Sequence, residues 1–67
     1  MTTHHIEILF QDGSCGYLAG FDGLEPDISW FREWALDYHD ETEANQDAYI
    51  LENRGYNAHV CRSEGNG

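Results

Sequence analysis

Alternating apolar and polar residues predict a β-hairpin near the start of the chain. Apolar side chains recur at every second position within residues 5–10, which places them on one face of a strand. Asp12 and Gly13 follow, and an Asp-Gly pair between apolar runs is a strong hairpin signal, since a type I′ turn needs positive φ at both central residues. Residues 15–21 are expected to form the returning strand.

The pattern then changes to the spacing of an amphipathic helix over residues 26–41. Pro26 suits the first position of a helix, and the acidic residues beside it suit the positive end of the helix dipole. One face of this helix would be a buried apolar stripe with helical spacing. Its members are Ile28, Phe31, Trp34, Ala35 and Tyr38.

The last third of the sequence predicts a second hairpin. Residues 42–47 are polar and have no period, so we expect a loop there, followed by a strand over residues 48–52. A turn with Gly55 in the left-handed conformation leads to a last strand over residues 56–61.

This order, ββαββ, predicts an α+β fold in which an antiparallel sheet of about four strands carries one helix on one face. Residues 1–62 are expected to form a single compact domain, and residues 63–67 a flexible polar tail. The edges of the two hairpins would permit a weak homodimer, so a monomer and a weak homodimer both stay open.

The charge of the chain excludes some classes of function. The 67 residues include 13 Asp and Glu but only 3 Arg and no Lys, and the net charge is −10. Direct contact with nucleic acid or with an anionic membrane needs a basic face, which this composition does not provide. Apolar runs are too short to cross a bilayer, and no signal peptide opens the chain, so we expect a cytoplasmic protein.

Carboxylates are concentrated on the second face of the predicted helix. Glu33, Asp37, Asp40 and Glu41 are spaced at i, i+4, i+7 and i+8, and like charges at i, i+4 destabilise a helix by roughly 0.2–0.5 kcal/mol per pair. Four helical residues rise about 6 Å, close to the roughly 6.8 Å between alternate phosphates of a DNA strand. The sequence therefore predicts a partner-binding surface that imitates DNA. Its residues are Glu33, Asp37, Asp40 and Glu41, with Asp27, Glu43 and Asp47 as outer charges and Trp30 as an apolar anchor.

On these features the chain resembles the small acidic proteins that bacteriophages encode against host defences, in particular anti-CRISPR proteins of the DNA-mimic type. The resemblance rests on chain length, a single small domain and the acidic row, and not on a sequence motif. It implies an inhibitor that occupies the DNA-binding surface of a host protein with a basic groove. Such a partner would be a CRISPR effector, either a type I surveillance complex or Cas9.

Two alternatives remain beside this interpretation. An acidic, lysine-free chain is also typical of a halophile's small soluble domain, which would need molar salt to fold. A small metal-binding module has the donor atoms it needs, but their spacing matches no zinc motif; the donors are His4, His5, His39, His59, Cys15 and Cys61. Neither alternative has an inhibitory role.

Catalysis and cofactor binding are not expected. A general acid needs a cleft that perturbs its ionisation, and the sequence contains no nucleophile elbow and no phosphate-binding glycine loop. Cys15 and Cys61 are expected to be reduced thiols in the cytoplasm. A disulfide between them or a shared metal stays open at this point.

Overall fold

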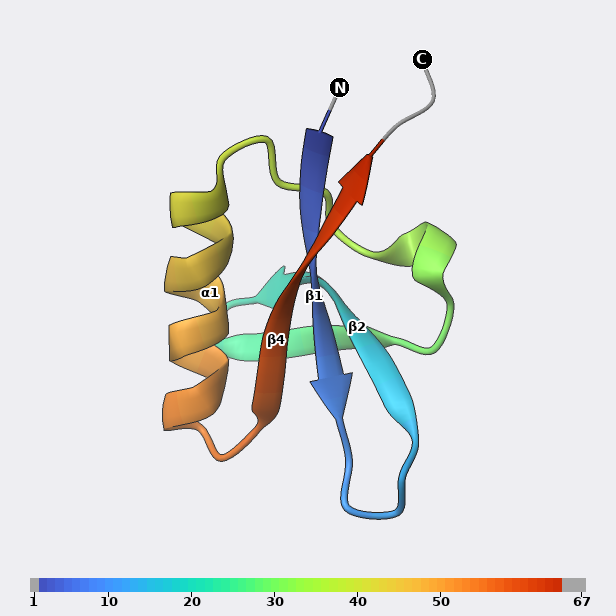
Figure 1. Ribbon diagram of the computed structural model, residues 1–67. Helices are drawn as coiled ribbons and strands as arrows, with labels where there is room; N and C mark the ends of the chain where they lie inside the picture. The colour runs from blue at the N-terminus through green and yellow to red at the C-terminus, as the bar shows by residue number, and fades with distance from the viewer. Residues whose placement is uncertain (1, 65–67) are drawn as a thin grey trace.

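The computed structural model describes residues 2–64 and has four antiparallel strands and one α-helix (Figure 1). The sheet order is β3-β2-β1-β4, and the predicted α+β class is confirmed. The element order is instead three strands, a 3₁₀ turn, the helix and the last strand. The elements are β1 (Thr2–Leu9), β2 (Cys15–Asp22), β3 (Glu25–Ser29), η1 (Arg32–Trp34), α1 (Glu41–Asn53) and β4 (Asn57–Glu64).

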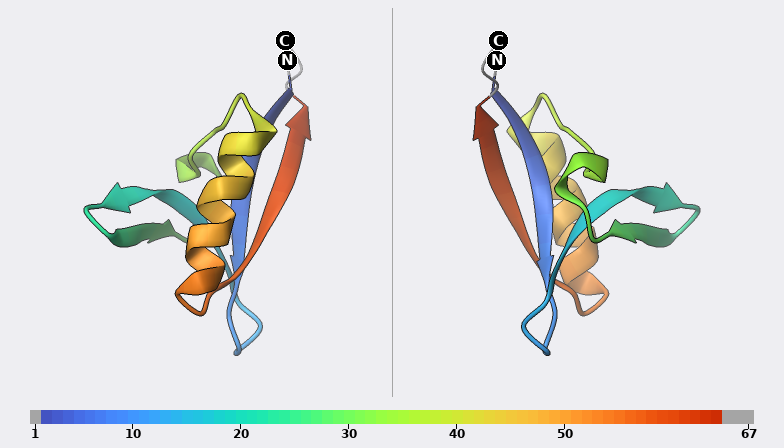
Figure 2. Two further views of the ribbon diagram at one scale, coloured as in Figure 1. Left: turned by 90° about the vertical axis from the view of Figure 1, so that its left-hand side faces the viewer. Right: turned by 90° about the vertical axis from the view of Figure 1, so that its right-hand side faces the viewer.

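The sheet is strongly twisted, so that β3 runs across the direction of β1 (Figure 1). The helix α1 lies along one side of the β1–β4 pair, and η1 lies on the other side (Figures 1 and 2). The β2–β3 hairpin extends away from that pair (Figure 2). Helix packing therefore falls mainly on β1 and β4.

The core lies between α1 and the β1–β4 half of the sheet. Ile6 and Ile8 of β1 are fully buried, as the alternating pattern predicts, and Leu51 of α1 meets them from the helix. Ala44 and Ala48 face the same core, and their small side chains let the helix approach the sheet closely. The core is therefore built from few large side chains and several alanines.

The predicted helix over residues 26–41 is wrong. Its first part is β3, which pairs with β2 through a two-residue hairpin loop that begins at Gly23, with φ of 64°. Pro26 is compatible with β3 because β3 is an edge strand, where a missing N–H costs no ladder hydrogen bond. The rest of the segment is irregular backbone around the short η1 turn, until α1 begins at Glu41.

The helix lies instead where a loop and a strand were predicted, over residues 42–52. Asp40 is its N-cap, and its side chain accepts a hydrogen bond of 2.9 Å from the backbone N–H of Thr42. Glu43 stands three residues after this cap, which is the sequence signature of a capping box. Buried Ala44 and Ala48 then follow with helical spacing.

Two glycine turns keep the positions that the sequence predicts for them. The first loop has three residues rather than a type I′ turn: Gly13 donates to the Phe10 carbonyl, and its φ is 91°. Gly55, with φ of 92°, ends α1. Its N–H bonds to the carbonyl of Glu52, and the next N–H bonds to that of Leu51, which is the Schellman arrangement.

The last strand is longer than predicted. It continues to Glu64, which pairs with Thr2, so Ser63 and Glu64 belong to the sheet and not to a flexible tail. Residues 65–67 of the predicted tail lie outside the described residues. The pairing of β4 with the whole length of β1 explains the difference, because the added residues continue the antiparallel ladder.

Candidate functional site

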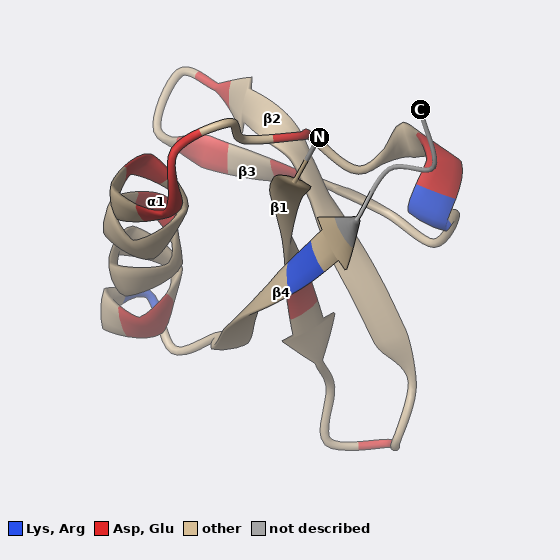
Figure 3. Cartoon of the chain, turned by 45° about the horizontal axis from the view of Figure 1, so that its top comes forward, with Lys and Arg blue, Asp and Glu red and all other residues tan. Residues whose placement is uncertain are grey.

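The eight predicted contact residues do not form one helical row. Acidic segments lie in α1 and the loop before it, in the β2–β3 hairpin, and beside η1 on the far side of the sheet (Figure 3). Glu33 belongs to η1, whereas Asp40 caps α1 and Glu41 begins it. The predicted spacing that would match a phosphate row is therefore lost, because no α-helix connects Glu33 to Asp37 and Glu41.

Several of these carboxylates have structural partners. An Arg32 nitrogen lies 3.7 Å from Asp37 Oδ1, and His4 Nε2 lies 3.6 Å from Glu41 Oε2. Asp47 accepts a hydrogen bond from the hydroxyl of buried Tyr38. Burial and this carboxylate both raise the pKa of Tyr38, so its hydroxyl stays a donor. Asp47 therefore serves the fold and is a poor candidate for partner contact.

The other half of the predicted set lies in one segment of the chain, residues 27–37, together with two aromatic residues that were expected in the core. Trp30, Phe31 and Trp34 are 58%, 63% and 66% exposed. Large exposed side chains of this kind, grouped within a few residues, mark interaction surfaces. The three acidic residues of the same segment are exposed as well. We define this aromatic–acidic patch as Trp30, Phe31 and Trp34 with Asp27, Glu33 and Asp37.

Local contacts fix the backbone of the patch. The ring of Trp30 packs against Phe10, with 5.3 Å between centroids. The N–H of Trp34 bonds to the Phe31 carbonyl at 3.1 Å, and positions three apart in a 3₁₀ turn lie on the same side. Ser29 accepts a hydrogen bond of 3.1 Å from the N–H of Phe31. The aromatic rings are thus presented by an ordered turn.

Arg32 ties this turn to the sheet. Its Nη2 donates to Ser63 Oγ at 2.8 Å, and that oxygen lies 3.0 Å from Nδ1 of His5. His5 is only 7% exposed, and its ring packs against Tyr17 with 5.8 Å between centroids. Burial lowers the pKa of His5, and the nearby Arg32 cation lowers it further. The neutral imidazole therefore belongs to the folded state.

This network predicts a pH dependence of stability. Because the pKa of His5 is lower in the folded than in the unfolded chain, the unfolded chain binds the proton more readily. The contribution is fully present above the ordinary histidine pKa of about 6.5 and is lost as the pH falls toward the folded pKa. Urea unfolding between pH 8 and pH 5 should show the decline. His5→Asn should flatten it, whereas the exposed His39→Asn should not; equal slopes in both variants would contradict the assignment.

The arginines do not form a basic face. Besides the Arg32 contact with Asp37, Arg54 lies 3.4 Å from Glu25. Arg32 belongs to η1, Arg54 is the C-cap of α1, and Arg62 belongs to β4 (Figure 3). Within residues 2–64 the arginines are therefore not gathered on one surface.

A metal site is not formed by the donor residues singled out from the sequence. Within residues 2–64, no three His, Cys, Asp or Glu side chains are grouped to hold an ion. Cys15 and Cys61 are both free thiols, because β1 lies between the strands that carry them. Burial raises the pKa of the Cys61 thiol, which disfavours the thiolate that binds metals.

The sequence reasoning missed Phe31 and Trp34 because it assigned them to a buried helical stripe. Three aromatics within five residues, interrupted by Arg32 and Glu33, were the available signal. Comparison with known proteins gives no match: no family model, no curated protein and no solved structure is detectably similar to this chain. None of the described helices has the length and apolar composition needed to cross a membrane.

Proposed function

We propose that this chain is an inhibitory protein-binding module that occupies the basic, nucleic-acid-binding surface of a partner protein. The observation that carries the proposal is the aromatic–acidic patch. Exposed aromatic side chains are typical anchors of protein interfaces, and a carboxylate rim selects a lysine- and arginine-rich partner. The overall charge of −10 adds long-range attraction toward such a surface.

The partner class we propose is a CRISPR effector, either Cas9 or a type I surveillance complex, which makes the chain an anti-CRISPR protein of the DNA-mimic type. This form of DNA mimicry does not use the single helical row of carboxylates that the sequence predicts. Carboxylates of the patch would replace a few phosphates, and the rings of Trp30 and Trp34 would supply contacts that a duplex backbone lacks. Affinity would then depend on apolar anchors as well as on charge.

An order-of-addition experiment tests this function. Guide-loaded Cas9 or a purified surveillance complex is incubated with the chain before or after labelled target DNA, and DNA binding is measured by gel shift. We expect inhibition when the chain is added first and little inhibition when the DNA is already bound. High salt should weaken the inhibition, because it screens exposed charges.

Two results of this experiment would contradict the proposal. Unchanged DNA binding by both effectors would reject the anti-CRISPR assignment. Equal inhibition in both orders of addition would show that the chain does not compete for the DNA-binding surface, which contradicts mimicry.

A further inference from the structure

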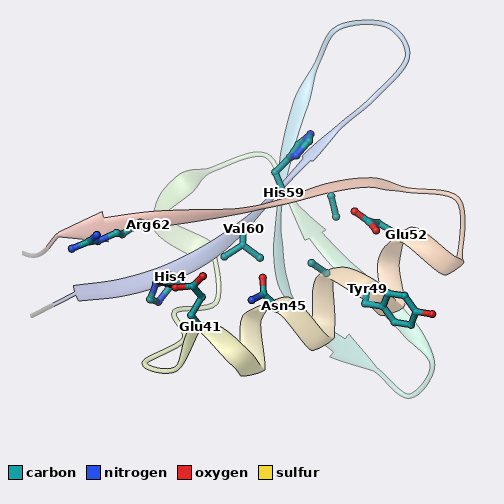
Figure 4. A pocket seen from close by; sticks show the side chains of 10 residues that line it. His4, Glu41, Asn45, Tyr49, Glu52, His59, Val60 and Arg62 are labelled. Carbon is teal, nitrogen blue, oxygen red and sulfur yellow. Dashed lines mark ion pairs between the residues drawn. The ribbon is translucent and has the colours of Figure 1, made fainter.

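A second surface lies on the opposite side of the molecule from the aromatic–acidic patch. It is a groove of about 530 Å³ between β4 and α1 (Figure 4). Its floor includes Ala58 and Val60, the helix side carries Glu41, Tyr49 and Glu52, and Arg62 of β4 lies at one end. In Figure 4 the side chains of Asn45 and Val60 lie in the space between the strand and the helix.

The strand that forms one wall of this groove has an open edge. β4 is the last strand in the sheet order, and among the described residues it pairs only with β1. An edge strand presents N–H and C=O groups that another strand can pair with. β4 is eight residues long, which is a long edge for a domain of this size, and alternate residues along it direct these groups to the open side.

The register shows which backbone groups face outward. His4 exchanges both of its backbone hydrogen bonds with Tyr38, on the side of β1 away from β4. Because backbone groups alternate between the two sides of a strand, the N–H and C=O groups of Ile6 and Ile8 also point away from β4. Their partners in β4 are Val60 and Ala58. The N–H and C=O of Ala58 and Val60 are therefore directed to the open edge, while their side chains line the groove.

We propose that this groove binds an extended basic peptide segment, which adds to β4 as a further strand. Strand addition beside a helix gives affinity through the main chain and specificity through alternate side chains. Glu41 and Glu52 stand toward the two ends of the helix wall, and both are exposed. Glu52 would pair with one lysine or arginine side chain of the segment, and a second would take the place of His4, which lies 3.6 Å from Glu41. Tyr49 would pack on the apolar stems of these side chains.

The spacing of the two glutamates limits the sequence of the segment. They are eleven positions apart in α1, which corresponds to about 16 Å along the helix axis. Two residues four positions apart in a strand are separated by about 13 Å and lie on the same face. Long basic side chains close the difference, so the segment should carry basic residues at i and i+4.

Charge also argues against a second copy of this chain as the occupant. Two chains of net charge −10 repel each other, whereas a basic segment is attracted. The preference for a basic partner and the proposed function both depend on the net negative charge of the chain. The groove and the aromatic–acidic patch are nevertheless formed by different residues. A peptide-binding measurement on the purified chain therefore succeeds or fails independently of the inhibition of an effector.

The probe is a fluorescent nine-residue peptide of Thr and Val with Lys at positions 3 and 7, measured by anisotropy. Methylating alternate backbone nitrogens of the peptide separates strand addition from simple charge attraction. We expect one set of alternate methylations to weaken binding at least tenfold and the other set to leave it unchanged. On the protein, peptide binding should slow hydrogen exchange at the amides of Ala58 and Val60.

Matched variants locate the site. Glu41→Gln and Glu52→Gln should each weaken peptide binding by about threefold, whereas Glu33→Gln, the same change on the other side of the sheet, should not. Equal effects of both methylation patterns would overturn strand addition. Unchanged binding in both groove variants would show that the peptide does not bind in the groove. Slow exchange of the two amides without peptide, together with a dimer in sedimentation, would assign the edge to a second copy.

Discussion

Leu51→Ala is expected to leave the chain largely unfolded at 37 °C. Leu51 is fully buried between α1 and the sheet, and a buried Leu→Ala change costs about 2–5 kcal/mol. A domain of this length holds only about 3–5 kcal/mol of net stability. The flanking core residues of α1 are alanines, which cannot expand to fill the space that the leucine leaves. Urea titrations followed by circular dichroism measure the loss.

Ile50→Ala is the matched control for this variant. Ile50 precedes Leu51 in the same helix but is 44% exposed, so its removal should cost less than about 1 kcal/mol. Similar unfolding midpoints for the two variants would contradict the packing of α1 through its Leu51 face.

Trp34→Ala is expected to have the opposite profile, with a normal fold and lost inhibition. Its ring is mostly exposed, so the free energy of unfolding should change by about 0.5 kcal/mol or less. Truncating a central aromatic anchor costs about 2 kcal/mol or more of binding, or roughly 30-fold in affinity. The DNA-competition assay measures this directly. Leu24→Ala, which removes an exposed apolar side chain from the β2–β3 turn, should leave inhibition unchanged.

The charged part of the patch can be tested in the same assay. Glu33→Lys and Glu43→Lys change the net charge equally, but Glu33 lies in the patch and Glu43 in the first turn of α1. The patch predicts a large loss for Glu33→Lys and only a modest, salt-sensitive loss for Glu43→Lys. If both variants lose inhibition equally, the total charge and not the patch determines binding. If Trp34→Ala inhibits normally, the aromatic anchors are not part of the interface.

The sequence predicted β1, β2 and β4 well because the patterns of these strands are local. The alternation around Ile6 and Ile8 and the glycine turn at Gly13 identify β1 and the first hairpin without reference to the rest of the chain. The left-handed Gly55 and the alternation around Ala58 do the same for β4. The fold class follows once these strands and one helix are recognised.

The middle of the chain was misassigned because its structure is set by contacts between distant residues. Residues 26–41 have an apolar spacing that fits a helix, but pairing of β3 with β2 through the Gly23 loop overrides it. The helix α1 was missed because its buried positions are small alanines, while Tyr49 and Ile50 gave the appearance of a strand. Its capping signature, Asp40 followed by Glu43, was the better evidence.

The misassigned helix and the missed helix α1 explain why the predicted binding surface differs from the observed arrangement. An acidic row on one helix became separate groups once Glu33 and Glu41 belonged to different elements. The aromatic residues that the helical pattern buried are instead exposed. The groove beside β4 was not predictable, since it depends on which strand forms the edge of the sheet and on where α1 packs.

The pairing of the first strand with the last has a consequence for synthesis of the protein. Thr2 pairs with Glu64, and the whole of β1 pairs with β4. A ribosome must therefore finish nearly all of this domain before β1 acquires its second neighbour and α1 its main packing surface. Closing so long a loop early is entropically unfavourable. Folding should accordingly be completed only after β4 has been synthesised, and it should be slower than that of a helical protein of equal length.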